Sequence, residues 1–531
     1  MASAALPARS APLAGASAES SFGASAAGPP FGRTAMIVAG MTLALANFVV
    51  VLDLTIANVS IPHIAGALAI TPQDGTYVVT SYSVAEAICV PLTGWLVNRF
   101  GAVRSFIFAL AGFGLFSMLC GLSNSIGMLV ICRLGQGFSG GPLMPLTQTL
   151  MLRVFPAHRQ PQAMAMWAMT TITAPIAGPI LGGWISDGWS WHWIFFINVP
   201  VVAACLTCAI VLLRRVETPT RKDPIDLVGL TLLVVWVGAL QLMLDLGREK
   251  DWFASPIIWT CAIAAAIGFA AFLIWELTEK HPIVDLKIFR HRGFVAAMIA
   301  MSVSYGAFFA SIVVIPQWLQ SSLGYTATNA GYVMAFQGIF AVMMAPFVPQ
   351  LMKRIDARAI VSIGVVWMGL TCLLRTQWST EVGFWTLAIP QLIQGIGMPM
   401  FFIPITVISV AAVLPSETAS ASGLMNFART LSGAFMAAIS GTLFSNLIVT
   451  NHVRLSDTLN APESVIGSLR ARGFDPLGAS SMLDGMVTQQ ATALAITQIF
   501  GMAAIMFFLA AATVWLSPRA KVIPGGIPTG H

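Results

Sequence analysis

The chain has 531 residues, of which 57% are hydrophobic and only 9% are charged. Soluble proteins carry about 25% charged residues, so this composition excludes a soluble globular protein and predicts a membrane protein with little mass outside the bilayer. The net charge of +6 does not indicate nucleic-acid binding, because the basic residues lie in short segments between apolar stretches.

The first 33 residues are rich in Ala, Ser, Gly and Pro. They lack the charged start, the short apolar core and the cleavage site of a signal peptide. We therefore expect residues 1–33 to form a disordered cytoplasmic tail, with the first apolar span acting as an uncleaved signal anchor. A second cytoplasmic tail is expected over residues 517–531.

Apolar stretches long enough to cross a bilayer recur along the whole chain. A hydrocarbon core of about 30 Å needs about 20 apolar residues in a helix. Fourteen stretches are candidates, at 34–58, 76–97, 104–123, 126–149, 164–186, 192–213, 225–245, 255–277, 293–316, 329–350, 359–375, 384–413, 422–447 and 494–516. The even number places both termini on one side of the membrane.

The positions of Lys and Arg test this topology. With both termini cytoplasmic, 19 of the 27 basic residues lie on the cytoplasmic side and 5 on the far side, and Arg133, Arg375 and Arg429 lie in or beside spans. This bias agrees with the positive-inside rule. Arg429 is near the start of its span, so its side chain is expected to extend to the membrane surface. The longest external segment, a periplasmic loop at about 449–493, is either a docking surface or tolerated loop length.

Two motifs of the first half return in the second half at a similar separation. LVICRLGQGFSGGPLMP (129–145) resembles IPQLIQGIGMPMFFIP (389–404), and GWLVNRFGAVR (94–104) resembles VPQLMKRIDAR (348–358) more weakly. Repeats that run parallel to each other in the membrane are typical of the major facilitator architecture.

The repeat predicts an all-α membrane protein with the major facilitator fold. Residues 34–213 and 293–516 are expected to form two pseudo-symmetric halves of six helices each. A linker and two inserted helices are expected between them, at 214–292.

Short signatures of one family occur from about residue 35 to residue 516. They are LDLTIANVSIP (52–62), PLTGWLVNRFG (91–101), CRLGQG (132–137), APIAGPILGGWISD (174–187), WIFFINVP (193–200), LMLDLGREKDWF (242–253), PIVDLKIF (282–289), GYTAT (324–328), PQLIQG (390–395) and NFARTL (426–431). With them, the chain resembles the fourteen-span drug:proton antiporters of the major facilitator superfamily, and most closely the multidrug resistance protein B (EmrB) type.

That resemblance implies export of amphipathic drugs or toxic compounds across a bacterial inner membrane, driven by proton entry and without a cofactor. It also implies a tripartite pump, in which a periplasmic adaptor protein and an outer-membrane channel are the partners. Two residues depart from the family pattern. Asn98 stands where most of the superfamily has Asp, and Glu86 is an acid where an uncharged residue is expected.

Asp53 and Glu86 are the two acids that lie well inside apolar spans. A charge at the bilayer centre costs about 2.5–3.5 kcal/mol on insertion scales. An acid in this setting can take up and release a proton as its surroundings alternate between wet and dry, so both are candidates for proton coupling. Asp53 could instead bond Asn58, and Glu86 could bond Tyr82 one turn away.

Arg133 is the expected partner of one of these acids, since a buried guanidinium without a counter-charge is costly. The sequence leaves open which acid it meets. The resemblance implies a role for Arg133 in proton transfer.

Two glycine-rich motifs are candidates for the moving parts. Small residues let helices approach closely, and a proline in a span removes a backbone hydrogen bond, so the fifth span is expected to bend. The predicted conformational residues are Gly94, Arg99, Gly101, Gly178, Pro179, Gly182 and Gly183. Ordinary helix packing is the alternative, and Asp187 is expected to cap or bridge at the outer end.

Aromatic and amide side chains with little fixed charge suit bulky lipophilic substrates. The predicted cavity residues are Gln136, Tyr305, Gln317, Phe336, Gln337, Gln391, Gln394, Phe401 and Asn426. Packing between helices is the alternative for each of them.

Three other functions compete with multidrug export. One is export of a single metabolite, such as a fatty acid or a siderophore. A membrane-embedded enzyme is disfavoured because no HxxxH, HExxH or nucleophile motif occurs, and a receptor or channel is disfavoured by the repeat. Cys205 and Cys208 form a CxxC without a nearby His or acid, so a packing role is expected rather than a metal site.

Overall fold

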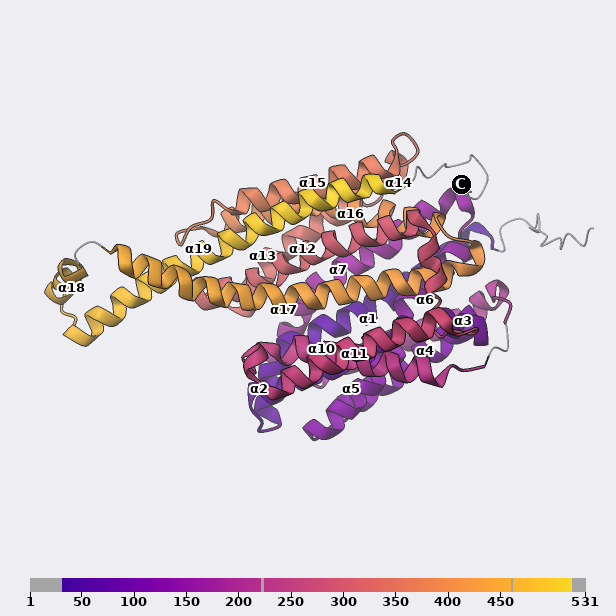
Figure 1. Ribbon diagram of the computed structural model, residues 1–531, viewed down its shortest axis with the longest axis horizontal. Helices are drawn as coiled ribbons and strands as arrows, with labels where there is room; N and C mark the ends of the chain where they lie inside the picture. The colour runs from indigo at the N-terminus through magenta and orange to yellow at the C-terminus, as the bar shows by residue number, and fades with distance from the viewer. Residues whose placement is uncertain (1–30, 221–223, 460–461, 518–531) are drawn as a thin grey trace, which may run out of the picture.

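The computed structural model describes residues 31–220, 224–459 and 462–517. Apart from their innermost residues, both predicted tails lie outside these ranges. The described chain is all-helical, and its long helices run roughly along one axis of the molecule (Figure 1). Eleven helices in these ranges are long and apolar enough to cross a membrane.

Three further predicted spans are each built from two helices with a short break between them. Each break contains a proline (Pro91, Pro142 or Pro346), which lacks the N–H that a continuous helix would use. The pairs are α2 (Pro72–Cys89) with α3 (Thr93–Phe100), α5 (Ile126–Gly140) with α6 (Leu143–Val154), and α13 (Ala327–Met344) with α14 (Val348–Leu351).

One group of helices comes from the N-terminal part of the chain. Its members are α1 (Arg33–Ala67), α2 to α6, α7 (Gln160–Gly188), α8 (Trp193–Phe196) and α9 (Asn198–Leu212). α1 packs along α7 and contacts α2, α6 and α9, while α4 (Ala102–Gly121) packs on α5 and α9. In Figure 1 α2, α4 and α5 of this group lie below the orange α17, whereas the purple α7 lies above it among the helices of the C-terminal part.

A second group comes from the C-terminal part. Its members are α12 (Arg292–Ser322), α13, α14, α15 (Ala357–Arg375), α16 (Phe384–Ala411), α17 (Thr418–Thr458) and α19 (Pro476–Thr513). α12 packs on α17 and α19, and α16 packs on α13 and α15. This grouping supports the predicted division into halves, whose boundaries stay a prediction.

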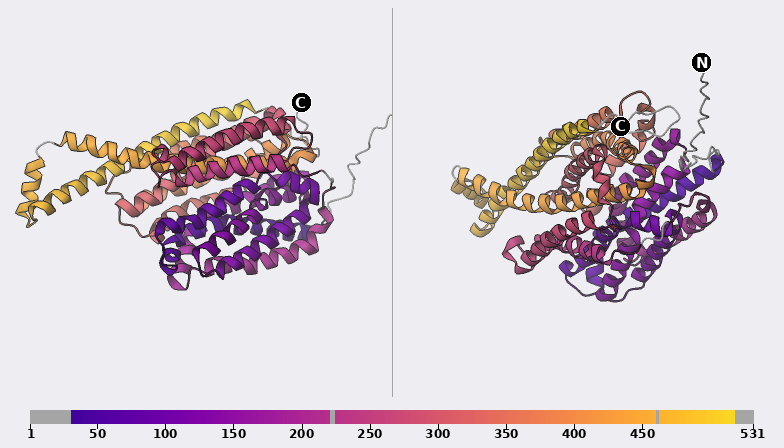
Figure 2. Two further views of the ribbon diagram at one scale, coloured as in Figure 1. Left: turned by 60° about the horizontal axis from the view of Figure 1, so that its bottom comes forward. Right: turned by 45° about the vertical axis from the view of Figure 1, so that its right-hand side comes forward.

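Between the two groups in sequence lie α10 (Leu227–Gly247) and α11 (Pro256–Thr278). They pack on each other, and α10 also contacts α2 of the first group and α17 of the second. The inserted pair therefore lies on the flank where both groups meet, as the views in Figure 2 also show.

The segment predicted as a loop at 449–493 is largely helical. α17 continues to Thr458, α18 covers Pro462–Ala471, and α19 begins at Pro476. At about 1.5 Å per residue, α17 is about 60 Å long, twice the thickness of a bilayer core. No proline interrupts it, so the helix continues beyond the bundle and forms a projecting hairpin with α19 (Figures 1 and 2).

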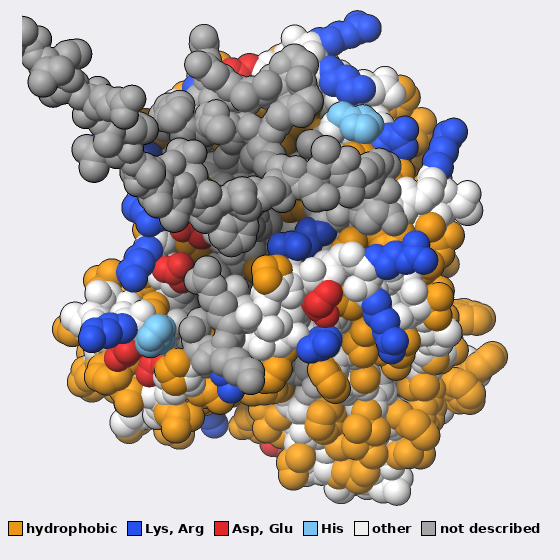
Figure 3. Space-filling model, turned by 90° about the vertical axis from the view of Figure 1, so that its right-hand side faces the viewer, with side chains coloured by type: hydrophobic (Ala, Val, Ile, Leu, Met, Phe, Trp, Pro, Cys, Tyr) orange, Lys and Arg blue, Asp and Glu red, His pale blue; other side chains and the backbone are white. Residues whose placement is uncertain are grey.

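The end of the molecule opposite this hairpin carries scattered Lys and Arg side chains beside an apolar flank (Figure 3). Charged ends around an apolar middle are what a bilayer-spanning bundle requires.

Candidate functional site

Asp53 and Arg133 form an ion pair in the interior of the N-terminal group. Both side chains are fully buried, and Arg133 Nη1 donates to Asp53 Oδ2. Asp53 Oδ1 also accepts hydrogen bonds from Gln136 Nε2 at 3.0 Å and from Asn198 Nδ2 at 2.7 Å. A carboxylate with one cation and two amide donors is well stabilised in its charged form.

The guanidinium of Arg133 is held from several sides. Its Nε donates to the Val78 carbonyl at 3.0 Å and its Nη1 to Gln136 Oε1 at 2.9 Å. Its Cζ lies 4.2 Å from the centre of the Tyr82 ring, a cation–π contact. The structure therefore decides what the sequence left open: Arg133 pairs with Asp53, and the cluster ties α1 to α2, α5 and α9.

Asn198 is a member of this cluster that the sequence analysis missed. Its Nδ2 also donates to Ser117 Oγ at 3.0 Å, and its side chain is 1% exposed. The signal was present in WIFFINVP, where an amide follows five apolar residues. A buried amide needs partners, and the carboxylate of Asp53 supplies one.

Glu86 on α2 is also buried, at 5% exposed, but in the described part of the chain it forms no ion pair. The alternative of a hydrogen bond to Tyr82 is not met, since the Tyr82 hydroxyl has no partner among the described residues. Glu86 lies one helical turn from Tyr82 on α2, and the Tyr82 ring contacts Arg133.

The prediction that Arg429 extends to the membrane surface is wrong. Its side chain is 2% exposed, and its Nη2 lies 2.6 Å from Met144 Sδ. Its Cζ lies 5.5 Å from the Trp167 ring and 5.7 Å from the Tyr305 ring. Because α17 packs on α6, the side chain of Arg429 is buried between the two helices. The position of Arg429 in the sequence could not indicate this contact.

The glycines of the fifth span meet α1 directly. A Cβ at Gly178 would lie 2.1 Å from Thr55 Oγ1, and one at Gly182 would lie 2.8 Å from the Ile56 carbonyl oxygen. Gly183 instead faces α13, with Thr328 Oγ1 at 3.6 Å. α7 runs through its prolines as one helix, so the structure contains a tight helix contact but no break at Pro179.

The second glycine motif lies where α3 meets α17. A Cβ at Gly94 would lie 2.2 Å from Ser420 Oγ. Gly101 has φ +91°, which favours glycine, and its successors Val103 and Arg104 donate backbone N–H groups to the Glu217 carboxylate. Arg99 and Asn98 line a polar pocket that Ser420 also lines.

Three of the predicted cavity residues form a polar cluster in the C-terminal group. Gln391 accepts from Arg375 Nη2 at 2.8 Å, and Gln394 accepts from the same atom and from Gln337 Nε2. Arg375 is fully buried, and its partners are amides rather than an acid. The sequence analysis placed Arg375 at a span edge and missed its role in this cluster.

The other predicted cavity residues are spread over several places. Gln136 belongs to the Asp53 cluster, Asn426 Nδ2 donates to Gln148 Oε1 at 2.9 Å, and Tyr305 packs against Phe402, a neighbour of Phe401. Phe336 packs on Phe384 and Trp385, and Gln317 is half-buried on α12. None of the nine lines the apolar cavity of about 650 Å³ between α10, α11 and α17.

Cys205 and Cys208 are free, and the described residues contain no group of three His, Cys, Asp or Glu side chains placed to hold a metal. Asp187 bridges to His63 of α1 at 3.0 Å.

The sequence profile of the Major Facilitator Superfamily matches residues 43–295 and 297–451. The chain is 40% identical over 508 residues to the multidrug export protein EmrB of Escherichia coli strain K12, covering 94% of this chain and 99% of that one. It is 38% identical over 509 residues to the fatty acid resistance protein FarB of Neisseria gonorrhoeae, covering 95% and 99%.

Two solved structures share the fold at low sequence identity. The proton:xylose symporter XylE aligns with a TM-score of 0.58 at 13% identity, covering 92% of this chain and 98% of that one. The human organic anion transporter MFSD10 aligns with a TM-score of 0.53 at 15% identity, covering 90% and 98%.

Proposed function

The chain belongs to the Major Facilitator Superfamily, in its EmrB-like multidrug-export branch, and from this premise we propose that it exports amphipathic compounds in exchange for protons. Members of this superfamily are transporters, which decides against the membrane-embedded enzyme. The chain is accordingly a multi-pass protein of a bacterial inner membrane.

The observation that carries the proposal is the Asp53–Arg133 ion pair. The pair is fully buried and bound by the amides of Gln136 and Asn198. If protonation neutralises Asp53, Arg133 loses its counter-charge, and the arrangement of α1 against α5 and α9 becomes less favourable. Binding and release of one proton therefore changes the stability of one conformation relative to another.

The driving force for this exchange is the membrane potential together with the pH gradient. Each charge that crosses gains about 2.3 kcal/mol per 100 mV. Glu86 is a second candidate proton site. We place it after Asp53, because Asp53 pairs with Arg133 whereas Glu86 forms no ion pair among the described residues.

The two groups of helices touch through contacts that a rocking motion would have to break. Gly94 meets Ser420, Asn426 bonds Gln148, and Gly183 faces Thr328. Each contact joins one helix of the N-terminal group to one of the C-terminal group. They support alternating access by movement of one group against the other.

A second candidate function is export of one anionic amphiphile, such as a fatty acid. It is supported by the relative from Neisseria gonorrhoeae, which is a fatty acid resistance protein. Transport assays with a panel of cationic, neutral and anionic amphiphiles separate the two: a multidrug exporter moves several classes, and a dedicated exporter moves one.

The projecting hairpin supports a periplasmic adaptor as partner. Apolar side chains are more than half exposed along it, at Val449, Val453, Leu477 and Met486. They lie beyond the length that a bilayer core covers, so water or another protein must surround them. We therefore place the hairpin in the periplasm, both termini in the cytoplasm, and an outer-membrane channel beyond the adaptor.

Substrate-induced proton release from the purified protein tests the coupling site. We expect Asp53→Asn to abolish the release, while Asp187→Asn, an exposed acid on α7, behaves as the wild type. Glu86→Gln is expected to reduce release without abolishing it. Normal release from Asp53→Asn would contradict the assignment, and loss only in Glu86→Gln would move the proton site to Glu86.

A further inference from the structure

A polar pocket lies at the end of the bundle opposite the projecting hairpin, where α3 meets the start of α17 (Figure 1). Its volume is about 210 Å³, below the value of about 300 Å³ at which sites for drug-sized molecules begin. The pocket is therefore suited to a small polar group rather than to cargo.

Three parts of the chain form this pocket. Asn98 and Arg99 come from α3, and Ser420 comes from α17. The segment 280–287, which follows α11, supplies most of the other lining residues, and Pro224, before α10, supplies one more. The pocket thus joins the N-terminal group, the C-terminal group and the inserted pair.

Positive charge dominates the lining. Arg99, Lys280 and Lys287 line the pocket, and Asp285 is the only acid among the described lining residues. Asp285 Oδ1 accepts the backbone N–H of Lys287 at 3.1 Å. Neither lysine forms an ion pair with a described residue. A small cavity with an excess of one sign of charge attracts the opposite charge, here an anion.

Two further features keep negative charge out of the pocket. The carboxylate of Glu279 accepts the backbone N–H groups of Lys280 and His281 at 2.8 Å and 3.3 Å, and it does not line the pocket. Asn98 is uncharged, at a position where most of the superfamily has Asp. An aspartate there would place a second carboxylate in the pocket.

The pocket lies at the level of lipid head groups. Ile274 and Leu277 of α11, shortly before Lys280, are each 67% exposed. Leu227 of α10, three residues after Pro224, is also 67% exposed. Exposed apolar side chains that give way to lysines mark the boundary between hydrocarbon and water. A phospholipid therefore reaches the pocket with its chains along α10 and α11.

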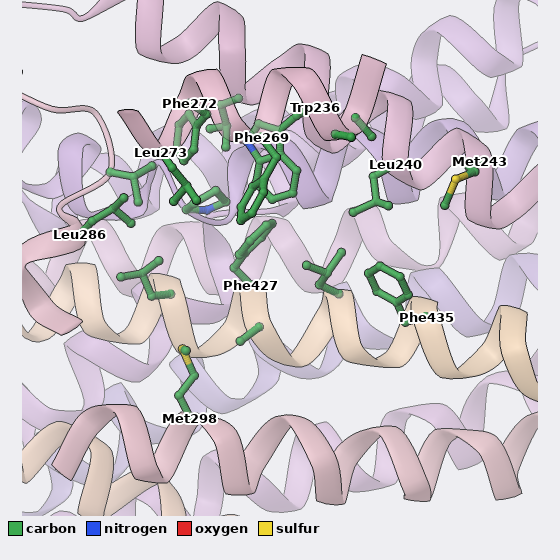
Figure 4. Close-up of a pocket in the computed structure, with 18 of the residues that line it drawn as sticks. Trp236, Leu240, Met243, Phe269, Phe272, Leu273, Leu286, Met298, Phe427 and Phe435 are labelled. Atoms are coloured by element: carbon green, nitrogen blue, oxygen red, sulfur yellow. The ribbon is translucent and has the colours of Figure 1, made fainter. Parts of the chain in front are cut away.

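The segment 280–287 also separates this pocket from the apolar cavity between α10, α11 and α17. Asp285 and Lys287 line the polar pocket, whereas Val284 and Leu286 line the apolar cavity. Figure 4 shows Leu286 at one end of that cavity. One short segment thus has a charged side and an apolar side, the division that a phospholipid has.

We propose that the polar pocket binds the phosphate group of an anionic phospholipid, held between Lys280 and Lys287 on one side and α3 on the other. Basic pockets between membrane helices are suited to such head groups. The bound phosphate joins α3 to the segment that leads into α12, so the lipid stabilises the conformation in which Gly94 meets Ser420. The binding does not depend on which compound is transported.

Native mass spectrometry of the full chain, purified in a neutral detergent, measures this binding. The probes are phosphatidylglycerol, phosphatidylcholine and soluble glycerol 3-phosphate, and we expect phosphatidylglycerol to bind most tightly. Lys280→Gln/Lys287→Gln should lower its affinity about thirtyfold, the factor for two charges near a membrane surface. Lys353→Gln/Arg354→Gln removes two exposed charges outside the pocket and should leave the affinity unchanged.

Asn98→Asp tests the charge of the pocket with little change in side-chain size. It should lower the affinity for phosphatidylglycerol about fivefold, the factor for one charge. Gln350→Glu adds the same charge at an exposed residue of α14 outside the pocket and is the control.

Thermal unfolding with and without phosphatidylglycerol shows that each variant is folded and gives a second measure of binding. The lipid should raise the melting temperature of the wild type and of both controls, and not that of Lys280→Gln/Lys287→Gln. Equal binding by all variants, or equal binding of the two lipids by the wild type, would overturn the proposal. Displacement of the lipid by an equal concentration of glycerol 3-phosphate would overturn the lipid as ligand and assign the pocket to a soluble phosphate ester.

Discussion

At the scale of single residues, the two halves treat a buried arginine differently. Arg133 has a carboxylate partner in Asp53, whereas the acceptors around Arg375 in the described chain are the amide oxygens of Gln391 and Gln394 and the Pro390 carbonyl. Only in the first arrangement can the arginine lose its counter-charge when the carboxylate takes up a proton, and regain it when the proton is released. The coupling chemistry is therefore expected in the N-terminal group, and the C-terminal cluster is expected to hold its helices in place.

This difference predicts unequal costs for removing the two arginines. Arg133→Gln leaves Asp53 buried without a cation, which should lower stability by about 3–5 kcal/mol. Arg375→Gln leaves amides that can bond one another, so its cost should be smaller. Thermal unfolding of the purified variants measures both. A larger loss in Arg375→Gln would mean that the amide cluster, not the ion pair, is the main polar contribution to stability.

At the scale of elements, the glycine motif of α7 predicted a close helix contact, and in the structure its partner is α1. Gly178 and Gly182 allow the backbones to approach, and the prolines of α7 do not interrupt it. The motif thus acts through contact distance in this conformation.

Gly178→Ala should destabilise the protein by about 1–3 kcal/mol, the usual cost of overpacking, and should slow export. The new methyl group would lie 2.1 Å from Thr55 Oγ1, too close without a shift of one helix. Gly188→Ala, on the same helix, is the control, since nothing lies within 4 Å of its Cβ position. Melting temperatures and export rates that are the same for both variants would argue against a packing role.

Ser420 offers a matching test at the contact of α3 with α17. Gly94→Ala places a methyl group 2.2 Å from Ser420 Oγ and should impair export. Ser420→Gly removes that oxygen and should restore part of the activity in the double variant. Export by the double variant no better than by Gly94→Ala would mean that Gly94 is required for another reason.

At the scale of the whole molecule, the structure combines a membrane bundle with a helical hairpin outside it. The hairpin ends lie at Thr458 of α17 and Pro476 of α19, and α18 between them packs on α19. Its side chains should therefore matter for partners more than for transport.

Replacing residues 456–478 by a short Gly/Ser linker should leave proton-driven export in vesicles intact and abolish drug resistance in cells. Cross-linking to the proposed periplasmic adaptor should be lost in parallel. Loss of export in vesicles would show instead that the hairpin stabilises the bundle. Unchanged resistance would place the adaptor contact elsewhere.

The sequence by itself determined the membrane class, the family and the candidate residues Asp53, Arg133, Gly178 and Gly182. These follow from hydropathy, from motifs and from the cost of charge in hydrocarbon, which are local properties of the chain. Prolines do not all interrupt a helix in this chain. Pro91 lies in the break between α2 and α3, whereas α7 runs through Pro175 and Pro179 as one helix. Local geometry permits a proline inside a helix when neighbouring helices support it.

Only the tertiary structure decided which groups meet. The partner of Arg133, the burial of Arg429 under α6, the place of Asn198 and the polar pocket beside Asn98 all depend on helices far apart in the sequence. Span periodicity is weak in an apolar chain, because lipid-facing and core-facing residues are both hydrophobic. Rotation of each helix about its axis is therefore set by packing against its neighbours.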